Sequence, residues 1–264
     1  MAEPRITFVL PFYNEADFIA DTLASLAAQA CGDFELVLVD NGSTDGSVAI
    51  AKAELDRSPR LRGRFVSEPS PGKTNALVAG MAVATHEFVG TLDADTFYPP
   101  DYVERLLAAF DANPDAAMVI GINTGSDQRR SQVSPSKRMQ IALWPRKCHG
   151  GGCAQAFRRD ALEQAGGFDP ARWPFVLEDH EIVCRVREYG GIAYDPRLVC
   201  RASDRRSDRS DAHWNRLERL LYKLVPAGRE SWFFDKFLRR RFAKRGLSNL
   251  QLRNQAWKAG EGSA

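Results

Sequence analysis

Short apolar runs alternate with amphipathic segments along the first 115 residues of the chain. The apolar runs are rich in β-branched and aromatic residues, which favours buried strands; they cover residues 5–10, 34–39, 65–67 and 88–92. Between them, apolar residues recur at helical spacing, which predicts helices over residues 16–30, from about 46 to 55, 73–84 and 101–113. Strands that alternate with helices are typical of a parallel, doubly wound sheet, so we expect an α/β fold.

After residue 115 the alternation weakens. A further strand is predicted over 118–122, and an element that starts near 139–144 is expected to pack beneath the site. Three glycines at 150–152 follow, and such a run lets the backbone approach a ligand closely. The remaining pattern predicts a helix that ends at 166–168, a second from 178 to about 189, and a last strand over 194–199.

Polar clusters follow each predicted strand of the first half. They occupy residues 11–15, 40–45, 71–73 and 93–95. Ligands of a doubly wound sheet bind outside the carboxyl ends of its strands. The four clusters therefore predict one shared site at this edge of the sheet.

Asp93 and Asp95 stand directly after an apolar strand and are separated by one residue. Alternate side chains of an extended chain point the same way, so these two like charges come close together. A cation offsets their repulsion, and oxygen ligands suit Mg²⁺ or Mn²⁺. The alternative is a solvated loop, or Asp95 capping the helix that starts near Pro99 and Pro100.

Composition and charge narrow the class of protein. With 264 residues, 44% apolar and 27% charged, the chain is typical of a soluble globular protein with an ample core. Its five scattered cysteines give no disulfide framework, and it has neither a secretory signal nor an apolar run long enough for a membrane, which predicts a cytoplasmic location.

Residues 201–264 carry 16 Lys and Arg against 7 Asp and Glu, a net +9, whereas the remaining chain has a net −7. We expect this basic end to meet phosphate or an anionic membrane surface.

Six motifs occur in the order seen in family 2 glycosyltransferases of the GT-A fold, and the chain resembles that family over about residues 5–200. The motifs are Val9-Leu10-Pro11-Phe12-Tyr13-Asn14-Glu15, Val39-Asp40-Asn41-Gly42-Ser43-Thr44-Asp45-Gly46, Gly72-Lys73-Thr74-Asn75-Ala76-Leu77, Asp93-Ala94-Asp95, Gly166-Gly167-Phe168 and Glu178-Asp179. The resemblance implies a Rossmann-like, mostly parallel sheet flanked by helices. It also implies a catalytic domain over 1–200, with a nucleotide-sugar half to about 115 and an acceptor half from about 116. Residues 201–264 are then a flexible arm and a helical, basic extension.

The resemblance implies a nucleotide-diphosphate sugar as donor, held with Mn²⁺ or Mg²⁺. The family often has a second aspartate where this chain has Asn41. A carboxylate accepts a base N–H, which suits a uracil or guanine ring. The implied donor residues are Pro11, Tyr13 and Glu15 for the nucleoside, Asp40 for the base, Lys73 for the diphosphate, Asp95 for the metal, and Asp93 for the ribose or the metal.

The Glu-Asp pair carries the acceptor chemistry that the resemblance implies. Asp179 acts as general base toward a sugar or lipid hydroxyl, and in-line attack inverts the anomeric carbon. Glu178 positions the acceptor, together with Gly151 and Gly152. Without the upstream motifs, two acids at a helix amino terminus are sufficiently explained by the helix dipole.

Beyond residue 199 the resemblance loosens. Residues 140–144 lack the arginine of the Gln-x-x-Arg-Trp motif found in many processive relatives, which predicts a non-processive enzyme. A late histidine or arginine often reaches the metal and diphosphate in such folds, and the candidates are His213, Arg205 and Arg206. His149, which stands beside Cys148 and Cys153, is a rival to His213, and a lone Cys-x4-Cys spacing is weak evidence for zinc.

The tail over 217–257 alternates apolar residues with arginines and lysines. It either lies on an anionic membrane, which places the enzyme at the inner face near a lipid-linked acceptor, or caps the catalytic domain. Nucleic acid is not expected as a partner, because the basic residues lack interleaved aromatics and a known motif.

The prediction is a metal-dependent inverting glycosyltransferase, and three alternatives remain. Asp93-Ala94-Asp95-Thr96 also fits the catalytic loop of haloacid dehalogenase-like phosphatases, but it follows the fourth strand here instead of the first. A sugar nucleotidyltransferase needs a glycine-rich, basic loop after the first strand, and residues 11–15 are acidic and glycine-free. A non-catalytic binder of nucleotide sugars is disfavoured by the presence of both Asp95 and Asp179.

Overall fold

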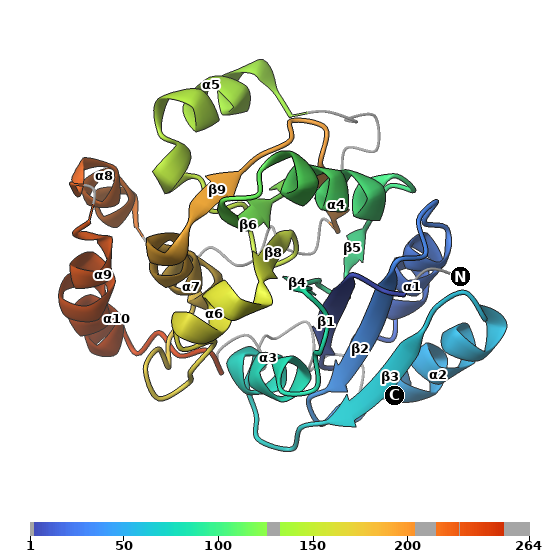
Figure 1. The fold of residues 1–264 in the computed structure, drawn as a ribbon. Helices are drawn as coiled ribbons and strands as arrows, with labels where there is room; N and C mark the ends of the chain where they lie inside the picture. Colours follow the sequence, from blue (N-terminus) through green and yellow to red (C-terminus); the bar gives the residue numbers. More distant parts are fainter. Residues whose placement is uncertain (1–2, 126–132, 204–214, 227, 251–264) are drawn as a thin grey trace.

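A mixed seven-stranded sheet forms the centre of the computed structural model, which describes residues 3–125, 133–203, 215–226 and 228–250 (Figure 1). Its strands are β1 (Ile6–Phe12), β2 (Phe34–Asp40), β3 (Gly63–Ser67), β4 (Phe88–Thr91), β6 (Ala116–Ile120), β8 (Gln155–Arg158) and β9 (Gly191–Ala193). Within the described ranges their order is β3-β2-β1-β4-β8-β6-β9. Strands β3, β2, β1 and β4 pair in parallel, β8 runs antiparallel to both of its neighbours, and β9 is parallel to β6.

A smaller sheet lies next to the pair of aspartates. It consists of β5 (Thr96–Phe97), β10 (Val199–Ala202) and β7 (Ile122–Asn123), with β10 in the middle. Asp93 and Asp95 lie in the short connection from β4 to β5, and the backbone N–H of Ser203 donates to the Asp95 carbonyl over 2.9 Å. The end of β10 is thereby fixed beside Asp95.

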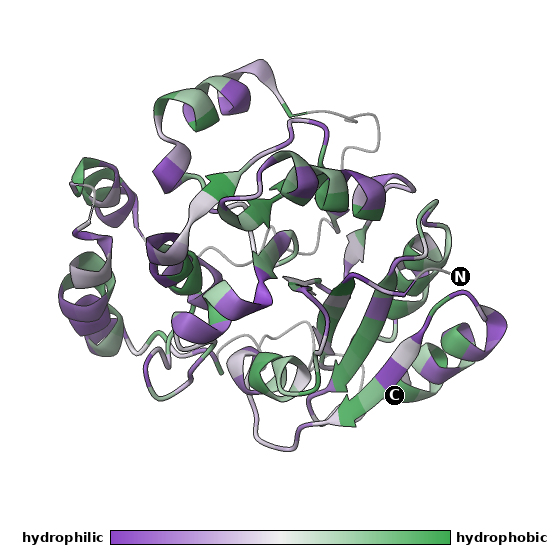
Figure 2. Cartoon of the chain, viewed as in Figure 1, coloured by the Kyte–Doolittle hydropathy of each residue, from purple (hydrophilic) through white to green (hydrophobic). Residues whose placement is uncertain are grey.

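Helices cover both faces of the main sheet, because the side chains of β1 and β2 are apolar on both sides. Phe8 and Leu10 pack on one face with α1 (Ile19–Ala27), α2 (Ser47–Arg57) and α4 (Tyr102–Ala112). Val9 packs on the other face with α3 (Lys73–Met81), α6 (Arg159–Gln164) and α7 (Glu178–Val186), which continues into η2 (Arg187–Tyr189). Every residue of β1 is buried, and Figure 2 shows the hydrophobic colouring along β1 and β2.

The predicted strands and helices of the first 115 residues are confirmed to within a few residues. Strand β8, between the glycines and the following helix, joins β4 to β6 and was not predicted from the sequence. One later expectation is wrong. The strand expected over 194–199 is instead split into β9 and β10, because Asp195 accepts the backbone N–H of Arg197 and bends the chain between them.

The element expected beneath the site lies at the surface. It is α5 (Pro135–Leu143), followed by η1 (Pro145–Lys147), and none of the residues of α5 is buried. Met139 in the middle of α5, Leu143 at its end and Trp144 just after it are exposed. The segment therefore borders the cavity from the side.

The carboxy-terminal segment is helical, as the sequence predicts. Its elements are α8 (Arg216–Leu224), α9 (Glu230–Trp232), the π-helix η5 (Phe233–Leu238) and α10 (Arg239–Arg245). Phe233, Phe234 and Phe242 join Trp173 and Cys184 in a third buried cluster. The described part of the tail thus caps the domain, and residues 251–257 of the predicted segment lie outside the described residues.

Two of the tail arginines are internal ion-pair partners. Buried Glu218 of α8 lies 2.8 Å from Arg241 Nε and 2.9 Å from Arg245 Nη1. Arg241 and Arg245 therefore bind a carboxylate of the protein, and the alternative in which the basic residues of the tail face a membrane is wrong for these two. No helix in the described residues is both long and apolar enough to cross a bilayer.

Candidate active site

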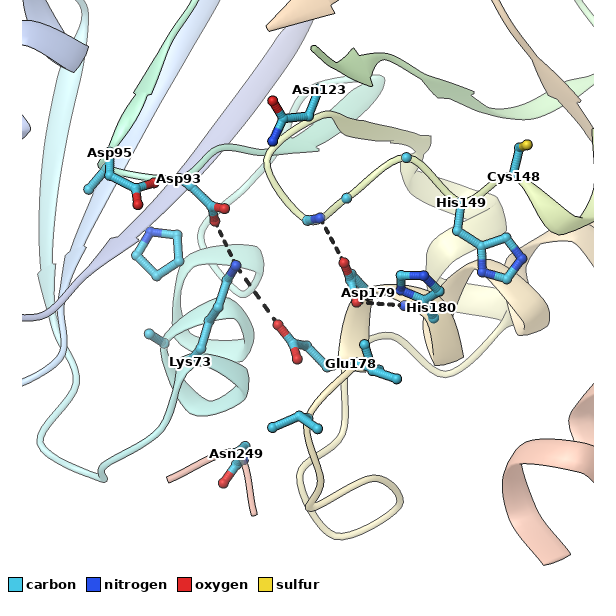
Figure 3. A pocket seen from close by; sticks show the side chains of 18 of the residues that line it. Lys73, Asp93, Asp95, Asn123, Cys148, His149, Glu178, Asp179, His180 and Asn249 are labelled. Carbon is cyan, nitrogen blue, oxygen red and sulfur yellow. Dashed lines mark hydrogen bonds and ion pairs between the residues drawn. The ribbon is translucent and has the colours of Figure 1, made fainter. Parts of the chain in front are cut away.

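A cavity of about 610 Å³ opens beyond the carboxyl ends of β1 and β4 (Figure 3). It brings together most of the predicted site residues, from both halves of the chain. Those that line it are Pro11, Tyr13, Glu15, Lys73, Asp93, Asp95, Gly151, Gly152, Glu178 and Asp179. Asp40 does not line it, and His213, Arg205 and Arg206 lie outside the described residues.

Lys73 links carboxylates from opposite walls of this cavity. Its Nζ lies 2.6 Å from Asp93 Oδ1 and 3.8 Å from Glu178 Oε1 (Figure 3). Burial raises the pKa of Glu178, while the charge of Lys73 opposes that rise. Carboxylates of the protein thus stand on both sides of the Lys73 ammonium group, at the point where β4 and α7 face each other.

Tyr98 fixes the position of the paired aspartates. The buried Tyr98 hydroxyl accepts the backbone N–H of Asp93 over 3.0 Å and donates to the carbonyl of Cys153 over 3.0 Å. Burial raises the pKa of this phenol well above its usual value, so the hydroxyl stays protonated and keeps donating. This one buried side chain therefore fixes the position of the paired aspartates relative to the glycine loop that precedes Cys153.

Asp93 and Asp95 place carboxylate oxygens side by side on this wall of the cavity. The Asp93 carboxylate holds the Lys73 ammonium group, and the two carboxylate oxygens of Asp95 each lie 3.4 Å from a hydroxyl, of Thr96 and of Ser203. Within the described ranges no three His, Cys, Asp or Glu side chains form a metal-binding group. The carboxylate oxygens therefore suit Mg²⁺ or Mn²⁺, which retain water and substrate phosphates as further ligands. The described residues do not form a site in which protein side chains alone complete the coordination of a metal.

The Asp179 carboxylate is held from two sides. The backbone N–H of Gly152 donates to Oδ2 over 2.8 Å, and His180 Nδ1 lies 2.9 Å from Oδ1 (Figure 3). A Cβ at position 152 would lie 3.2 Å from Lys73 Nζ and 3.4 Å from Asp179 Cβ, so a side chain there would crowd the Lys73 ammonium group. Burial raises the pKa of Asp179, but the charge and hydrogen bond of His180, then Lys73 and the Gly152 amide, outweigh burial and hold it well below its usual range.

Neighbouring side chains fix the backbone around Asp179 and His149. Gln155 Nε2 on β8 donates to the carbonyls of His149 and Asp179, over 2.9 and 3.1 Å. His149 Nε2 lies 2.7 Å from the Tyr222 hydroxyl of α8, and burial holds the pKa of His149 well below its usual value, so this imidazole is neutral. The described residues provide no zinc site around Cys148 and Cys153.

The loop after β2 explains why an asparagine stands where an aspartate is often found. The Asn41 amide donates to the carbonyls of Glu68 and Ser70, each over 2.8 Å, and its carbonyl accepts the N–H of Gly72 over 2.8 Å. An ionised aspartate has no donor for the first two bonds. Asn41 therefore holds the turn that delivers Lys73.

Two further acids of the same loop carry turn contacts. Asp40 Oδ1 accepts the N–H of Ser43 over 2.9 Å, and Asp45 accepts N–H groups of Ser47 and Ala16. Burial raises the pKa of Asp45, but the Ser47 and Ala16 hydrogen bonds hold it below its usual value. The contact of Asp40 with a nucleotide base stays a prediction.

Residues 7–166 match the family model described as glycosyl transferase family 2. The chain belongs to this family. An uncharacterized glycosyltransferase of Nostoc sp. (strain PCC 7120) is 28% identical over 191 residues, which are 68% of this chain and 59% of the relative. The chain spans between half and three fifths of the length of the first curated relatives that it matches.

Solved structures of low identity share the fold of this family 2 chain. The mannosyltransferase PcManGT from Pyrobaculum calidifontis, solved with GDP-Man and Mn²⁺, has a TM-score of 0.68 at 24% identity and covers all of this chain and 77% of its own. S. aureus TarS 1–349, solved with UDP-GlcNAc, has a TM-score of 0.62 at 19% identity over 90% of this chain and 73% of its own. The predicted GT-A fold is thereby confirmed.

The depressed pKa of Asp179 gives an expected pH dependence. If Asp179 is the base, activity falls only as the pH drops through that low pKa, so the acidic limb of kcat/KM lies below the range of an ordinary aspartate. Replacing His180 with Gln keeps a donor but removes the imidazole charge, and we expect the limb to move to higher pH. Rate measurements from pH 3.5 to 8 test this. His86→Gln, which changes a histidine 3.5 Å from Glu35 outside the cavity, is the matched control and should leave the limb in place.

Proposed function

We propose that this family 2 chain is a metal-dependent, inverting and non-processive glycosyltransferase. It transfers a sugar from a UDP- or GDP-sugar to a hydroxyl group of a glycan or of a lipid-linked glycan. The observation that carries this proposal is the single cavity in which Asp95 lies on one wall and Asp179 on the other, with Lys73 between their neighbours Asp93 and Glu178.

The donor occupies the wall formed by the ends of β1, β2 and β4. Pro11, Tyr13 and Glu15 contact the nucleoside, and Lys73 binds the diphosphate. Asp40, at the end of β2 and outside the cavity lining, accepts a hydrogen bond from a base that extends beyond the cavity. Asp93 lies near the ribose and keeps the Lys73 ammonium in position. Both fold neighbours were solved with nucleotide sugars, which supports this class of donor.

Asp95 holds the Mn²⁺ or Mg²⁺ ion, and His213, Arg205 or Arg206 completes the diphosphate site. When bound, the ion stabilises the negative charge that develops on the departing diphosphate. Strand β10 ends at Ala202, and the backbone N–H of Ser203 donates to the Asp95 carbonyl.

Asp179 takes the proton of the acceptor hydroxyl as its oxygen bonds to the anomeric carbon. The bond from that carbon to the diphosphate breaks on the opposite side, so the configuration inverts. The Gly152 amide and His180 hold the carboxylate in place, and Glu178, Gly151 and Gly152 position the acceptor. Non-processive transfer is favoured because residues 140–144 lack the arginine of the processive motif.

A screen of nucleotide sugars tests the proposal. Thermal shift with a panel of UDP- and GDP-sugars and Mn²⁺ should identify one donor that raises the melting temperature. NMR of the product formed from that donor should then show an anomeric configuration opposite to the donor's. Stabilisation by no member of the panel, or retention of configuration, contradicts the proposal.

We also propose that α8 rests on an anionic membrane at the inner face. Leu217, Leu220 and Leu224 are 53%, 55% and 69% exposed, opposite the buried Glu218 and Tyr222. An amphipathic helix with an exposed apolar stripe and flanking cations is suited to the lipid interface.

Sedimentation with vesicles that contain phosphatidylglycerol should pull down the chain, and more weakly as salt increases. Changing the three leucines of α8 to Gln should reduce the bound fraction about tenfold or more, since each loses buried apolar area. Val78→Gln, at an exposed apolar residue of α3, is the control and should have no effect. Equal binding of both variants would refute the assignment to α8.

A further inference from the structure

The cavity is acidic at one end and basic at the other. Asp93, Asp95, Glu178 and Asp179 line the donor end, with Lys73 between them. The opposite end is bordered by α5, η1 and α8, and its cations are Lys137, Lys147, Arg219 and Lys223. The proposed donor chemistry uses none of these four.

Lys147 has a structural explanation. Its Nζ lies 3.0 Å from the buried carboxylate of Glu230 and 4.5 Å from the centre of the Tyr222 ring. Burial lowers the pKa of Lys147, and Glu230 opposes this change. This lysine ties η1 to α8 and α9.

The other three cations have no carboxylate partner within the ranges that the structure describes. Lys137 Nζ bonds only to a neutral group there, the Gln140 amide oxygen at 3.2 Å. Arg219 and Lys223 stand one helical turn apart on α8, on the flank that faces the cavity. Three positive charges that line one end of a cavity, with no carboxylate beside them in the described ranges, attract an anion to it.

Lys137 and Lys223 come from helices far apart in the sequence, and both line the same cavity, together with Cys148. Cys148 stands beside His149 there (Figure 3). The electrostatics agree with this placement: burial raises the pKa of the Cys148 thiol, and the charges of Lys137 and Lys223 both oppose that rise. The two helices thus deliver their cations to one end of the cavity.

We infer that Lys137, Arg219 and Lys223 bind a phosphate group of the acceptor, whose hydroxyl is presented to Asp179. Ammonium groups and a guanidinium are the usual ligands of phosphate. This inference rests on the proposed glycosyltransferase function and adds a substrate class to it: the acceptor is a phosphorylated molecule, either soluble or carried on a lipid.

Isothermal titration with two probes tests the inference, in the presence of Mn²⁺ and a saturating nucleoside diphosphate. The probes are glycerol 3-phosphate for a soluble acceptor and phosphatidylglycerol in detergent micelles for a lipid-linked one, since each carries a phosphate and a separate hydroxyl group. Wild-type protein should bind at least one of them. The triple variant Lys137→Gln/Arg219→Gln/Lys223→Gln should bind it at least about tenfold more weakly, since charge-assisted hydrogen bonds are lost, and should bind the nucleoside diphosphate as the wild type does.

The variant Arg138→Gln/Lys236→Gln/Lys244→Gln removes the same charge from exposed positions outside the cavity and is the control. The inference is overturned if wild-type protein binds neither probe, if both triple variants lose affinity equally, or if the cavity variant loses the nucleotide. If the chain binds no nucleotide at all, the proposed function fails, whereas probe binding measured without nucleotide still decides the phosphate site.

Discussion

Replacing Asp179 with Asn is expected to reduce kcat by about 10²- to 10⁴-fold, the range that general-base catalysis contributes. Asparagine has nearly the shape of aspartate and can still accept the Gly152 N–H, but it cannot take a proton from the acceptor. The KM for the donor should change by less than about threefold, since Asp179 acts on the acceptor and not on the nucleotide. Initial rates and donor titration measure the two quantities separately.

Asp21→Asn is the control, because it makes the same chemical change on the exposed face of α1. It should leave the rate unaltered. Thermal melts of both variants exclude a change of fold as the cause. Full transfer by Asp179→Asn with unaltered donor binding would show that the base lies elsewhere.

Replacing Asp95 with Asn should cost about 10²-fold or more in transfer, because removing a carboxylate about 4 Å or less from a cation forfeits several kcal/mol. EDTA should bring the wild type to the same low rate, and added Mn²⁺ should restore the wild type alone. Nucleoside diphosphate should bind the wild type at least about tenfold more tightly with Mn²⁺ than with EDTA, and this difference should vanish in the variant.

Asp93→Asn gives the matched comparison, two positions away on the same wall. It removes the partner of Lys73 and leaves Asp95 intact, so its nucleotide affinity should still respond to Mn²⁺. If Asp95→Asn keeps the response to Mn²⁺ and Asp93→Asn loses it, the metal assignment must be exchanged between the two. If EDTA leaves the wild-type rate unaltered, no metal takes part.

The sequence predicts the donor half of the fold because its signals are local. Strands buried on both faces, such as β1 and β2, appear in the sequence as continuous apolar runs. Because these strands are parallel, the residues that follow their carboxyl ends come together at one edge of the sheet. That is sufficient to bring Asp93, Asp95 and Lys73 to one cavity. A local contact also explains why residue 41 is an asparagine, because its amide group donates hydrogen bonds to the loop that precedes Lys73.

The acceptor half depends on contacts that no local pattern contains. Strand β8 has only four residues and pairs antiparallel between two others, so its place depends on partners distant in the sequence. His180 follows Asp179 directly in the sequence, and this adjacency could have been used to predict that His180 is the charge partner of Asp179. Tyr222 and Lys223 reach the cavity only because the tail folds back on Trp173, which the order of motifs does not reveal.

The central claim is that one wall of the cavity binds a divalent cation and, through it, the diphosphate of the donor. The most direct measurement is an anomalous difference map at the manganese absorption edge, from crystals grown with Mn²⁺ and a nucleoside diphosphate. We predict a single strong peak coordinated by a carboxylate oxygen of Asp95 and by diphosphate oxygens, with the nucleoside against Tyr13 and Glu15. A manganese peak and nucleotide bound away from Asp95 would contradict it.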